Sequence, residues 1–320
     1  MQIDLPYLDL ISGRTIRLRI LLLLLWGLGI SCIGQADSDE VFMINNELMQ
    51  IVQCSRCGSN KWRFGSNEMA CESCNNTLEI FEDIILYTPD SRLVEKPEHV
   101  IRDKQANGYL QHCKFGSHRE SLSTFISLLP EFAKQRPILD LGCGPGPSTE
   151  ILQDYGFEKL VSIDFSTQSL LLNKSQLDII HPKFVRADLN EVSFVEKSVS
   201  VVLMTDFLQH LGDWDVQYSF MQKTLRALIP GGRFYLSCFN INIKNYLKGD
   251  IHGSFSNGNI RYSRLHHKEL CQLIPEGFVV DAIKPMNISM NSRVDKLLCK
   301  LPLASFLGRW SVVTGFRVPE

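Results

Sequence analysis

The chain has 320 residues, of which 44% are apolar and 21% are charged, and it carries a net charge of −2. This composition excludes a disordered chain, and the length allows one large core with an appendage, because single domains seldom exceed about 250 residues. The near-neutral net charge argues against a strong electrostatic attraction for nucleic acid.

The chain begins with an arginine-flanked apolar run. Arg14, Arg17 and Arg19 precede the uncharged residues 20–36, which look like a signal peptide or a short membrane anchor. The acidic residues 37–40 would then direct the following chain out of the cytoplasm. We treat residues 1–42 as a separate segment with three alternatives: an upstream mis-start, with translation beginning at Met43 or Met49, a retained anchor, or a cleaved signal.

Two C-x-x-C pairs lie in the segment 50–90. Cys54 and Cys57 are separated by thirteen residues from Cys71 and Cys74, a spacing typical of four-cysteine zinc sites. Gly58 helps the first pair to turn, and the short strands nearby have too little core to fold unaided. We therefore predict a structural zinc ribbon, with free or redox-active pairs as the alternative. The other six cysteines are scattered, which favours a reducing compartment over a disulfide framework; they are Cys32, Cys113, Cys143, Cys238, Cys271 and Cys299.

The next segment shows little periodicity. Residues 89–116 contain prolines and charges, which predicts a linker over 91–116 that also covers a pocket. Ser117 and Glu120 then form a capping-box pattern, which predicts the start of a helix ahead of the first buried strand.

Residues 138–148 read ILDLGCGPGPS, a pattern of strand, glycine turn and helix. Such a turn points backbone N–H groups and a helix N-terminus at a ligand, commonly a dinucleotide or S-adenosylmethionine. The dinucleotide fingerprint requires glycine or alanine where Pro147 stands. Asp140 would repel a pyrophosphate, whereas it would attract the ammonium of a methionine moiety. A zwitterionic ligand is therefore favoured.

The stretch LDLGCGPG resembles the first motif of the class I S-adenosylmethionine-dependent methyltransferases. The likeness continues through LVSIDFS, FVRADLNEVSF, VSVVLMTDFLQHL and LRALIPGGRFYLS in the order of that family's elements. It implies an α/β fold with a Rossmann-like seven-stranded methyltransferase sheet in residues 117–320, behind a small four-cysteine zinc ribbon. A similar ribbon precedes the methyltransferase domain in some rRNA guanine methyltransferases.

The resemblance also implies a cofactor site. Asp164, twenty residues after Gly144, suits the two ribose hydroxyls of S-adenosylmethionine, and Asp188 occupies the position that meets the adenine amino group. The implied cofactor-binding residues are Asp140, Gly142, Cys143, Gly144, Gly146, Asp164, Phe165, Asp188, Leu189 and Thr205.

His210 is the candidate general base, because the loop after the fourth strand faces the acceptor in the resembled fold. A purely structural histidine is the alternative. The long polar and aromatic residues 239–263 are expected to cover the acceptor pocket, and rival bases lie on or just after them: Tyr246, His252, Tyr262, His266 and His267.

The sequence thus predicts a cytoplasmic enzyme that methylates a small-molecule or lipid-like acceptor, with membrane association through residues 16–36 if the apolar run is retained. The first alternative is an RNA methyltransferase that grips RNA with its ribbon. Three basic residues against six acidic ones in 50–90 disfavour it. The second alternative is a non-catalytic S-adenosylmethionine-binding module.

Overall fold

The computed structural model describes residues 48–320, except for residues 94–96, 114–116, 178–181, 290 and 302. The apolar run at 20–36 and the alternative start at Met43 lie outside this part of the chain. Within it, no helix has the length and apolar character needed to cross a bilayer.

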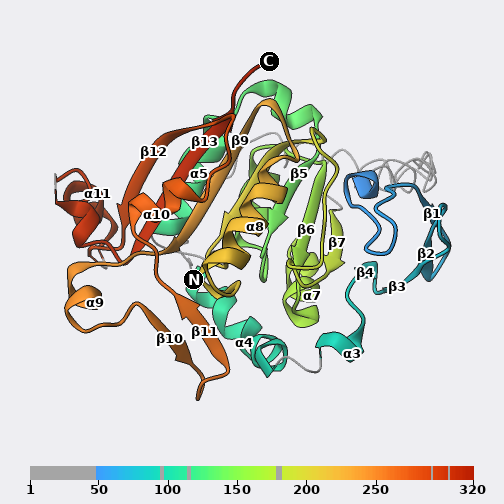
Figure 1. The fold of residues 1–320 in the computed structure, drawn as a ribbon, viewed down its shortest axis with the longest axis horizontal. Helices are drawn as coiled ribbons and strands as arrows, with labels where there is room; N and C mark the ends of the chain where they lie inside the picture. Colours follow the sequence, from blue (N-terminus) through green and yellow to red (C-terminus); the bar gives the residue numbers. More distant parts are fainter. Residues whose placement is uncertain (1–47, 94–96, 114–116, 178–181, 290, 302) are drawn as a thin grey trace, which may run out of the picture. The chain divides into compact units, whose positions relative to one another are not determined.

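One eleven-stranded sheet runs through the described chain (Figure 1). The order β7-β6-β5-β8-β9-β13-β12 confirms the predicted seven-stranded methyltransferase sheet. The strands from β7 to β9 in this order are parallel to one another, whereas β13 is antiparallel to both of its neighbours, β9 and β12. The core strands are β5 (Ile138–Leu141), β6 (Leu160–Asp164), β7 (Lys183–Arg186), β8 (Val199–Thr205), β9 (Leu228–Phe239), β12 (Phe278–Met286) and β13 (Trp310–Arg317).

The central strands are buried on both faces, because helices cover a parallel sheet on each side. Alternation along β5 sends Leu139 and Leu141 into one hydrophobic cluster and Ile138 into the other. The first cluster includes α8 (Trp214–Leu225) and α10 (His267–Gln272). The second includes α5 (Ser117–Ser127) and α6 (Pro147–Asp154). Further helices are α7 (Thr167–Ser175), α9 (Ile243–Leu247) and α11 (Ser292–Leu298), with short 3-10 turns η2 (Glu131–Gln135), η3 (Leu208–His210) and η4 (Ala304–Phe306).

The cysteine-bearing segment is joined to the core sheet. We call residues 49–93 the cysteine module; it contains η1 (Met49–Ile51), β1 (Trp62–Phe64), β2 (Glu68–Cys71), β3 (Thr77–Phe81), β4 (Ile84–Leu86) and α3 (Asp90–Leu93). Strands β1 to β4 are antiparallel to one another, and β4 pairs in parallel with β7. Met49, Val52 and Trp62 belong to the same hydrophobic cluster as β5. The module and the core therefore share one sheet and one core, whereas the sequence suggested a ribbon separated by a linker.

A helix occupies much of the expected linker. Helix α4 (Pro97–Cys113) spans 17 residues and packs against α7. Among its residues with described side chains, only Ala106 is fully buried, so the helix carries no clear apolar stripe. Its weak periodicity explains why the sequence suggested a linker.

Residues 239–263 fold into α9 followed by a hairpin of β10 (His252–Phe255) and β11 (Ile260–Ser263). Strand β11 packs against η3, so the hairpin lies beside His210. This agrees with the expectation that the insertion covers the site at the end of β8.

Candidate functional site

Two adjoining cavities lie at the carboxyl ends of β5, β6, β7 and β8. The larger has a volume of about 460 Å³ and the smaller about 100 Å³. Both are lined by Gly142, Asp164, Phe165, Phe207 and His210. The crevice outside the carboxyl ends of parallel strands is where open α/β sheets bind ligands, so the two cavities together form the candidate site.

The glycine turn forms the floor of the cleft. Gly142 has a φ of +65°, and a Cβ there would stand 2.6 Å from the ring of Phe207. Gly146 has a φ of +99°, and a Cβ there would stand 2.3 Å from the Oδ1 of Asn173. Pro147 then begins α6 at its first turn, where the missing N–H costs nothing. Two of the glycines are thus required by close packing as well as by backbone conformation.

Asp140 lies beneath the turn and does not line the cleft. Alternation along β5 points its side chain to the α6 face, where it accepts hydrogen bonds from Ser148 Oγ at 2.5 Å and Thr149 Oγ1 at 3.3 Å. Burial raises the pKa of Asp140 to about 7, against the lowering effect of the two hydroxyls. The geometry favours a role in fixing the turn to α6 over the direct ammonium contact expected from the sequence.

Two other residues of the turn also point away from the cavities. Cys143 is buried against Ile84, Leu170 and Phe184, and its burial raises its pKa well above the ordinary value. Gly146 packs on α7, as described above. The remaining sequence-implied cofactor residues all line the cleft: Gly142, Gly144, Asp164, Phe165, Asp188, Leu189 and Thr205.

The carboxylate of Asp164 is tied to the backbone of the turn. Its Oδ2 accepts the N–H of Gly144 at 3.0 Å, and its Oδ1 accepts the N–H of Ser166 at 2.9 Å. Burial raises the pKa of Asp164, and these two hydrogen bonds oppose that shift. Each carboxylate oxygen has further acceptor capacity, so the group can hold a ligand hydroxyl as well.

Helix α4 supplies a wall that the sequence did not identify residue by residue. Glu98, Arg102, Gln105, Ala106 and Tyr109 line the smaller cavity. Arg102 forms an ion pair with Glu98 at 3.1 Å, one helical turn away. The charged residues of the expected covering segment gave the only sequence signal for this wall.

His210 reaches both cavities from η3. Its Nδ1 lies 2.7 Å from the carbonyl oxygen of Arg261 on β11, so Nδ1 carries the proton that this bond needs and Nε2 has a lone pair. Burial lowers the pKa of His210 to about 4, helped by the charge of Arg102. The imidazole is therefore neutral at neutral pH, and its Nε2 can accept a proton or a hydrogen bond.

A contact between a histidine and an aspartate beside the smaller cavity was missed by the sequence analysis. Asp206, which lines the smaller cavity, lies 3.1 Å from the Nδ1 of His118 and accepts a hydrogen bond from Ser237 Oγ at 2.8 Å. Burial acts to lower the pKa of His118, but the charge of Asp206 outweighs it and leaves that pKa raised. Burial acts to raise the pKa of Asp206, but His118 outweighs it and leaves that pKa lowered. The two form a charged pair at the wall of the smaller cavity.

The other five candidate bases lie outside the two cavities. Tyr262 donates its hydroxyl proton to Asp250 at 2.6 Å, and His266 caps α10. Tyr246 is 68% exposed and His252 is exposed. Burial lowers the pKa of His267 to about 4. None of these five residues lines the two cavities, so His210 is the better-placed base among the candidates.

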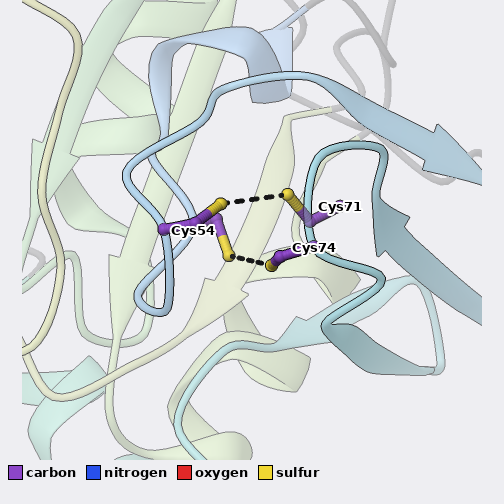
Figure 2. Close-up of side chains that lie close together, drawn as sticks. Cys54, Cys71 and Cys74 are labelled. Atoms are coloured by element: carbon purple, nitrogen blue, oxygen red, sulfur yellow. Dashed lines mark hydrogen bonds between the residues drawn. The ribbon is translucent and has the colours of Figure 1, made fainter.

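The four paired cysteines meet at one point. Their sulfur atoms lie within 4.8 Å of one another, with Cys54 and Cys74 separated by 3.7 Å and Cys57 and Cys71 by 3.6 Å. Figure 2 shows the side chains converging from two facing loops. A Zn–S bond of about 2.3 Å gives about 3.8 Å between the sulfurs of a tetrahedral site, close to the separations of these two pairs, so the cluster has dimensions that suit zinc.

The two knuckles share one backbone pattern. The carbonyl of Cys54 accepts the N–H of Gly58 and the carbonyl of Cys71 accepts the N–H of Asn75, each at 2.9 Å. Gly58 and Asn75 both have positive φ, which closes each loop around its two thiols. Four thiols arranged in this way could complete a tetrahedron around one metal ion and leave no open position.

Comparison with known proteins agrees with this geometry. A family model described as "Methyltransferase domain" matches residues 139–236. The chain is 28% identical over 124 residues to a ubiquinone biosynthesis O-methyltransferase of Idiomarina loihiensis, covering 36% of this chain and 47% of that protein. It is 34% identical over 107 residues to a cypemycin N-terminal methyltransferase of a Streptomyces species, covering 32% and 42%. The chain thus spans less than half the length of each of these relatives.

A solved structure shows the same fold. A complex between the Haloferax volcanii Trm112 methyltransferase activator and a methyltransferase superposes with a TM-score of 0.52, at 16% identity, over 68% of this chain and 98% of that one. At this identity the likeness concerns the fold alone. With the strand order, the glycine turn and the matched family, the chain carries a class I S-adenosylmethionine-dependent methyltransferase domain.

Proposed function

We propose that this protein transfers a methyl group from S-adenosylmethionine to a small-molecule or lipid-like acceptor. One observation carries the proposal: Gly142, Gly144, Asp164 and Asp188, which follow or end three consecutive parallel strands, line one cleft. Its larger cavity, about 460 Å³, lies in the usual range for cofactor pockets.

Each residue has a role in this proposal. Asp164 accepts hydrogen bonds from the ribose hydroxyls, and Asp188 accepts one from the adenine amino group. The backbone of Gly142 and Gly144 lies against the methionine part of the cofactor. Phe165 supplies an apolar wall beside Asp164. The bound cofactor supplies the electrophilic methyl carbon.

The chemistry needs alignment and one proton acceptor. The acceptor's oxygen or nitrogen forms a bond to the methyl carbon while the carbon–sulfur bond breaks, and the sulfur keeps that electron pair as a neutral thioether. A hydroxyl acceptor gives its proton to Nε2 of His210, which the low pKa keeps unprotonated at neutral pH. The Arg261 carbonyl holds the ring in place.

The acceptor class is inferred from the covering segment and the relatives. Asn259 and Arg261 of the β10–β11 hairpin line the larger cavity, so the hairpin forms one wall of the space that an acceptor would enter. One relative is named for O-methylation in ubiquinone biosynthesis and the other for methylation of a peptide N-terminus. Neither name refers to RNA. RNA methylation through the cysteine module is the second candidate, and the acidic excess of residues 50–90 disfavours it.

Labelling tests the proposal directly. Purified protein is incubated with S-adenosylmethionine carrying a labelled methyl group and with host extract, which is then separated into RNA, protein, lipid and small molecules. Label in the lipid or small-molecule fraction supports the proposal, and label in RNA supports the alternative. Cofactor binding with no transfer to any fraction would identify a binding module instead.

The four cysteines are proposed to hold one structural zinc ion. Metal analysis of protein made with zinc supplied should give about one zinc per chain, since four thiolates form one tetrahedron. Replacement of Cys54 or Cys74 by serine should release it. The absence of zinc from the unmodified protein would contradict this assignment.

A further inference from the structure

The loop after β7 forms one wall of the larger cavity. We call residues 187–191 the Asp188 loop; Ala187, Asp188, Leu189 and Asn190 all line that cavity. Inside the loop, the N–H of Asn190 donates to the Asp188 carboxylate at 3.0 Å and the N–H of Glu191 to the Asp188 carbonyl at 2.9 Å. These bonds shape the turn, but they do not attach it to the rest of the protein.

Thr88 attaches the loop to the cysteine module. Its side-chain oxygen accepts the N–H of Asp188 at 3.0 Å, and its hydroxyl proton goes to the Glu191 carboxylate at 3.1 Å. Thr88 is 1% exposed, so its own hydroxyl is shielded from water. One buried hydroxyl thus joins both ends of the Asp188 loop.

Arg186, the last residue of β7, strengthens the same junction. Its carbonyl accepts the N–H groups of Tyr87 and Thr88 at 3.0 and 3.2 Å. Its guanidinium donates to the Thr88 carbonyl at 3.0 Å and forms an ion pair with Asp90 at 2.5 Å. The chain leaving β4 is therefore held along the start of the loop.

A second segment of the module holds the chain that follows the loop. The N–H of Gln53 donates to the Ser193 carbonyl and the N–H of Val195 donates to the Ile51 carbonyl, each at 2.9 Å. Cys54 directly follows Gln53. The hydroxyl of Tyr87 donates to the Gln53 carbonyl at 2.7 Å, which connects the two segments of the module to each other.

We propose that the cysteine module positions the Asp188 loop, with Thr88 as the positioning residue, so that metal binding by the four thiols strengthens cofactor binding. The inference rests on the proposed function, because it assigns the larger cavity to S-adenosylmethionine. Zinc in the cluster would fix the Cys54–Gly58 knuckle to the Cys71–Asn75 knuckle. The first knuckle directly follows Gln53, which bonds to Ser193 after the loop and to Tyr87 beside Thr88. Coupling of this kind is reciprocal, so the cofactor strengthens metal retention by the same factor.

The first test replaces the positioning hydroxyl. Thr88→Val keeps the side-chain volume and removes both hydrogen bonds, Thr88→Ser keeps the hydroxyl, and Thr77→Val changes an exposed threonine of β3 as the matched control. Calorimetric titration with S-adenosylhomocysteine should show about 5- to 30-fold weaker binding for Thr88→Val. Thr88→Ser should stay within about twofold of the unmodified protein because it keeps the hydroxyl that makes both bonds, and Thr77→Val should do so because it is a surface change. Unchanged binding by a folded Thr88→Val would overturn the proposal.

The second test follows the loop itself. Hydrogen exchange of residues 187–191 is measured on the full chain with zinc and after its removal by a chelator. Zinc removal and Thr88→Val should each accelerate exchange at Asp188, whose N–H bonds to Thr88, and zinc removal should weaken S-adenosylhomocysteine binding. Tyr87→Phe, which removes the hydroxyl that bonds to the Gln53 carbonyl, serves if Thr88→Val does not fold.

The outcomes separate this inference from the proposed function. If the unmodified protein binds no S-adenosylhomocysteine, the proposed function fails, while faster exchange at Asp188 still reports the attachment of the loop to the module. If the cofactor binds equally with and without zinc and exchange at Asp188 does not change, the positioning role is overturned. Loss of acceptor methylation alone on zinc removal, with cofactor binding intact, would likewise overturn it.

Discussion

The backbone N–H of Gly144 donates to the carboxylate of Asp164 at 3.0 Å, across twenty positions of sequence. This bond joins the glycine turn after β5 to the end of β6, so the two motifs act as one unit. The same carboxylate accepts the N–H of Ser166 at the start of α7. A change at Asp164 therefore affects the shape of the turn as well as ligand binding.

We expect Asp164→Asn to weaken S-adenosylmethionine binding by about 1.5–3 kcal/mol, because a charged, buried acceptor is replaced by a neutral group. The measurement is calorimetric titration with S-adenosylhomocysteine. Glu158→Gln, at an exposed carboxylate just before β6, is the matched control and should bind normally. An unchanged dissociation constant for Asp164→Asn would remove this residue from the site.

Gly146 provides a test of close packing in the turn. Gly146→Ala forces a side chain into a backbone with φ of +99° and against Asn173, which is itself held by Thr149 at 3.0 Å. Gly156→Ala imposes a φ of +78° but meets no atom within 4 Å. Both changes strain the backbone, and only the first overpacks the interior.

In urea unfolding we expect Gly146→Ala to lose about 1–3 kcal/mol more stability than Gly156→Ala, the usual cost of overpacking. Equal losses in the two variants would mean that α7 moves to accept the added methyl group, and would refute the packing argument.

The proton acceptor is tested by His210→Asn. Asparagine can still donate to the Arg261 carbonyl in place of Nδ1, but it has no atom where Nε2 stands. With the acceptor found by labelling, kcat should fall about 10²- to 10⁴-fold, the range for loss of a general base. Cofactor affinity should be unchanged. His252→Asn, at an exposed histidine of β10, should retain full activity. Full activity in His210→Asn would show that His210 is not the proton acceptor and that its role is structural.

Short, spaced motifs made much of this site predictable from sequence. Gly142, Asp164 and Asp188 follow or end consecutive strands, and the order of strands in a parallel sheet brings such positions together. The spacing of the four cysteines likewise predicts a shared metal site. Each of these signals lies within a few residues of the chain, where sequence patterns are most informative.

Contacts between distant single residues left no such signal. The pairing of β4 with β7 joins segments about a hundred positions apart, and the Thr88 hydroxyl bonds to Asp188 across the same interval. Asp140 was placed in the right motif, but alternation along β5 points its side chain to the α6 face. Helix α4 has too little buried surface to show an apolar stripe.

The pair of His118 and Asp206 belongs to the same class of long-range contact and leads to a pH dependence of stability. Asp206 adopts a φ of +56°, uncommon for a residue other than glycine, and its carboxylate sits 3.1 Å from the His118 ring. The pKa of His118 is raised in the folded protein and that of Asp206 is lowered. Both shifts mean that folding favours the charged forms.

The pH dependence of folding stability follows from the directions of these two pKa shifts. The raised pKa of His118 contributes stability that is fully present below its unfolded pKa of about 6.5 and is lost as pH rises through the folded value. The lowered pKa of Asp206 contributes stability above about pH 3.9 that is lost as pH falls through its folded value. The pair therefore stabilises the fold most strongly between those two limits, in mildly acidic solution.

We expect His118→Asn to cost about 1.5–3 kcal/mol near pH 5.5, the usual value of a hydrogen bond between charged groups, and progressively less towards pH 9. Urea unfolding of both proteins at pH 5.5, 7 and 9 measures this difference, with His252→Asn as a control that should show none. A cost that stays constant or grows between pH 5.5 and 9 would show that His118 is uncharged in the folded protein and that its contact with Asp206 is an ordinary neutral hydrogen bond.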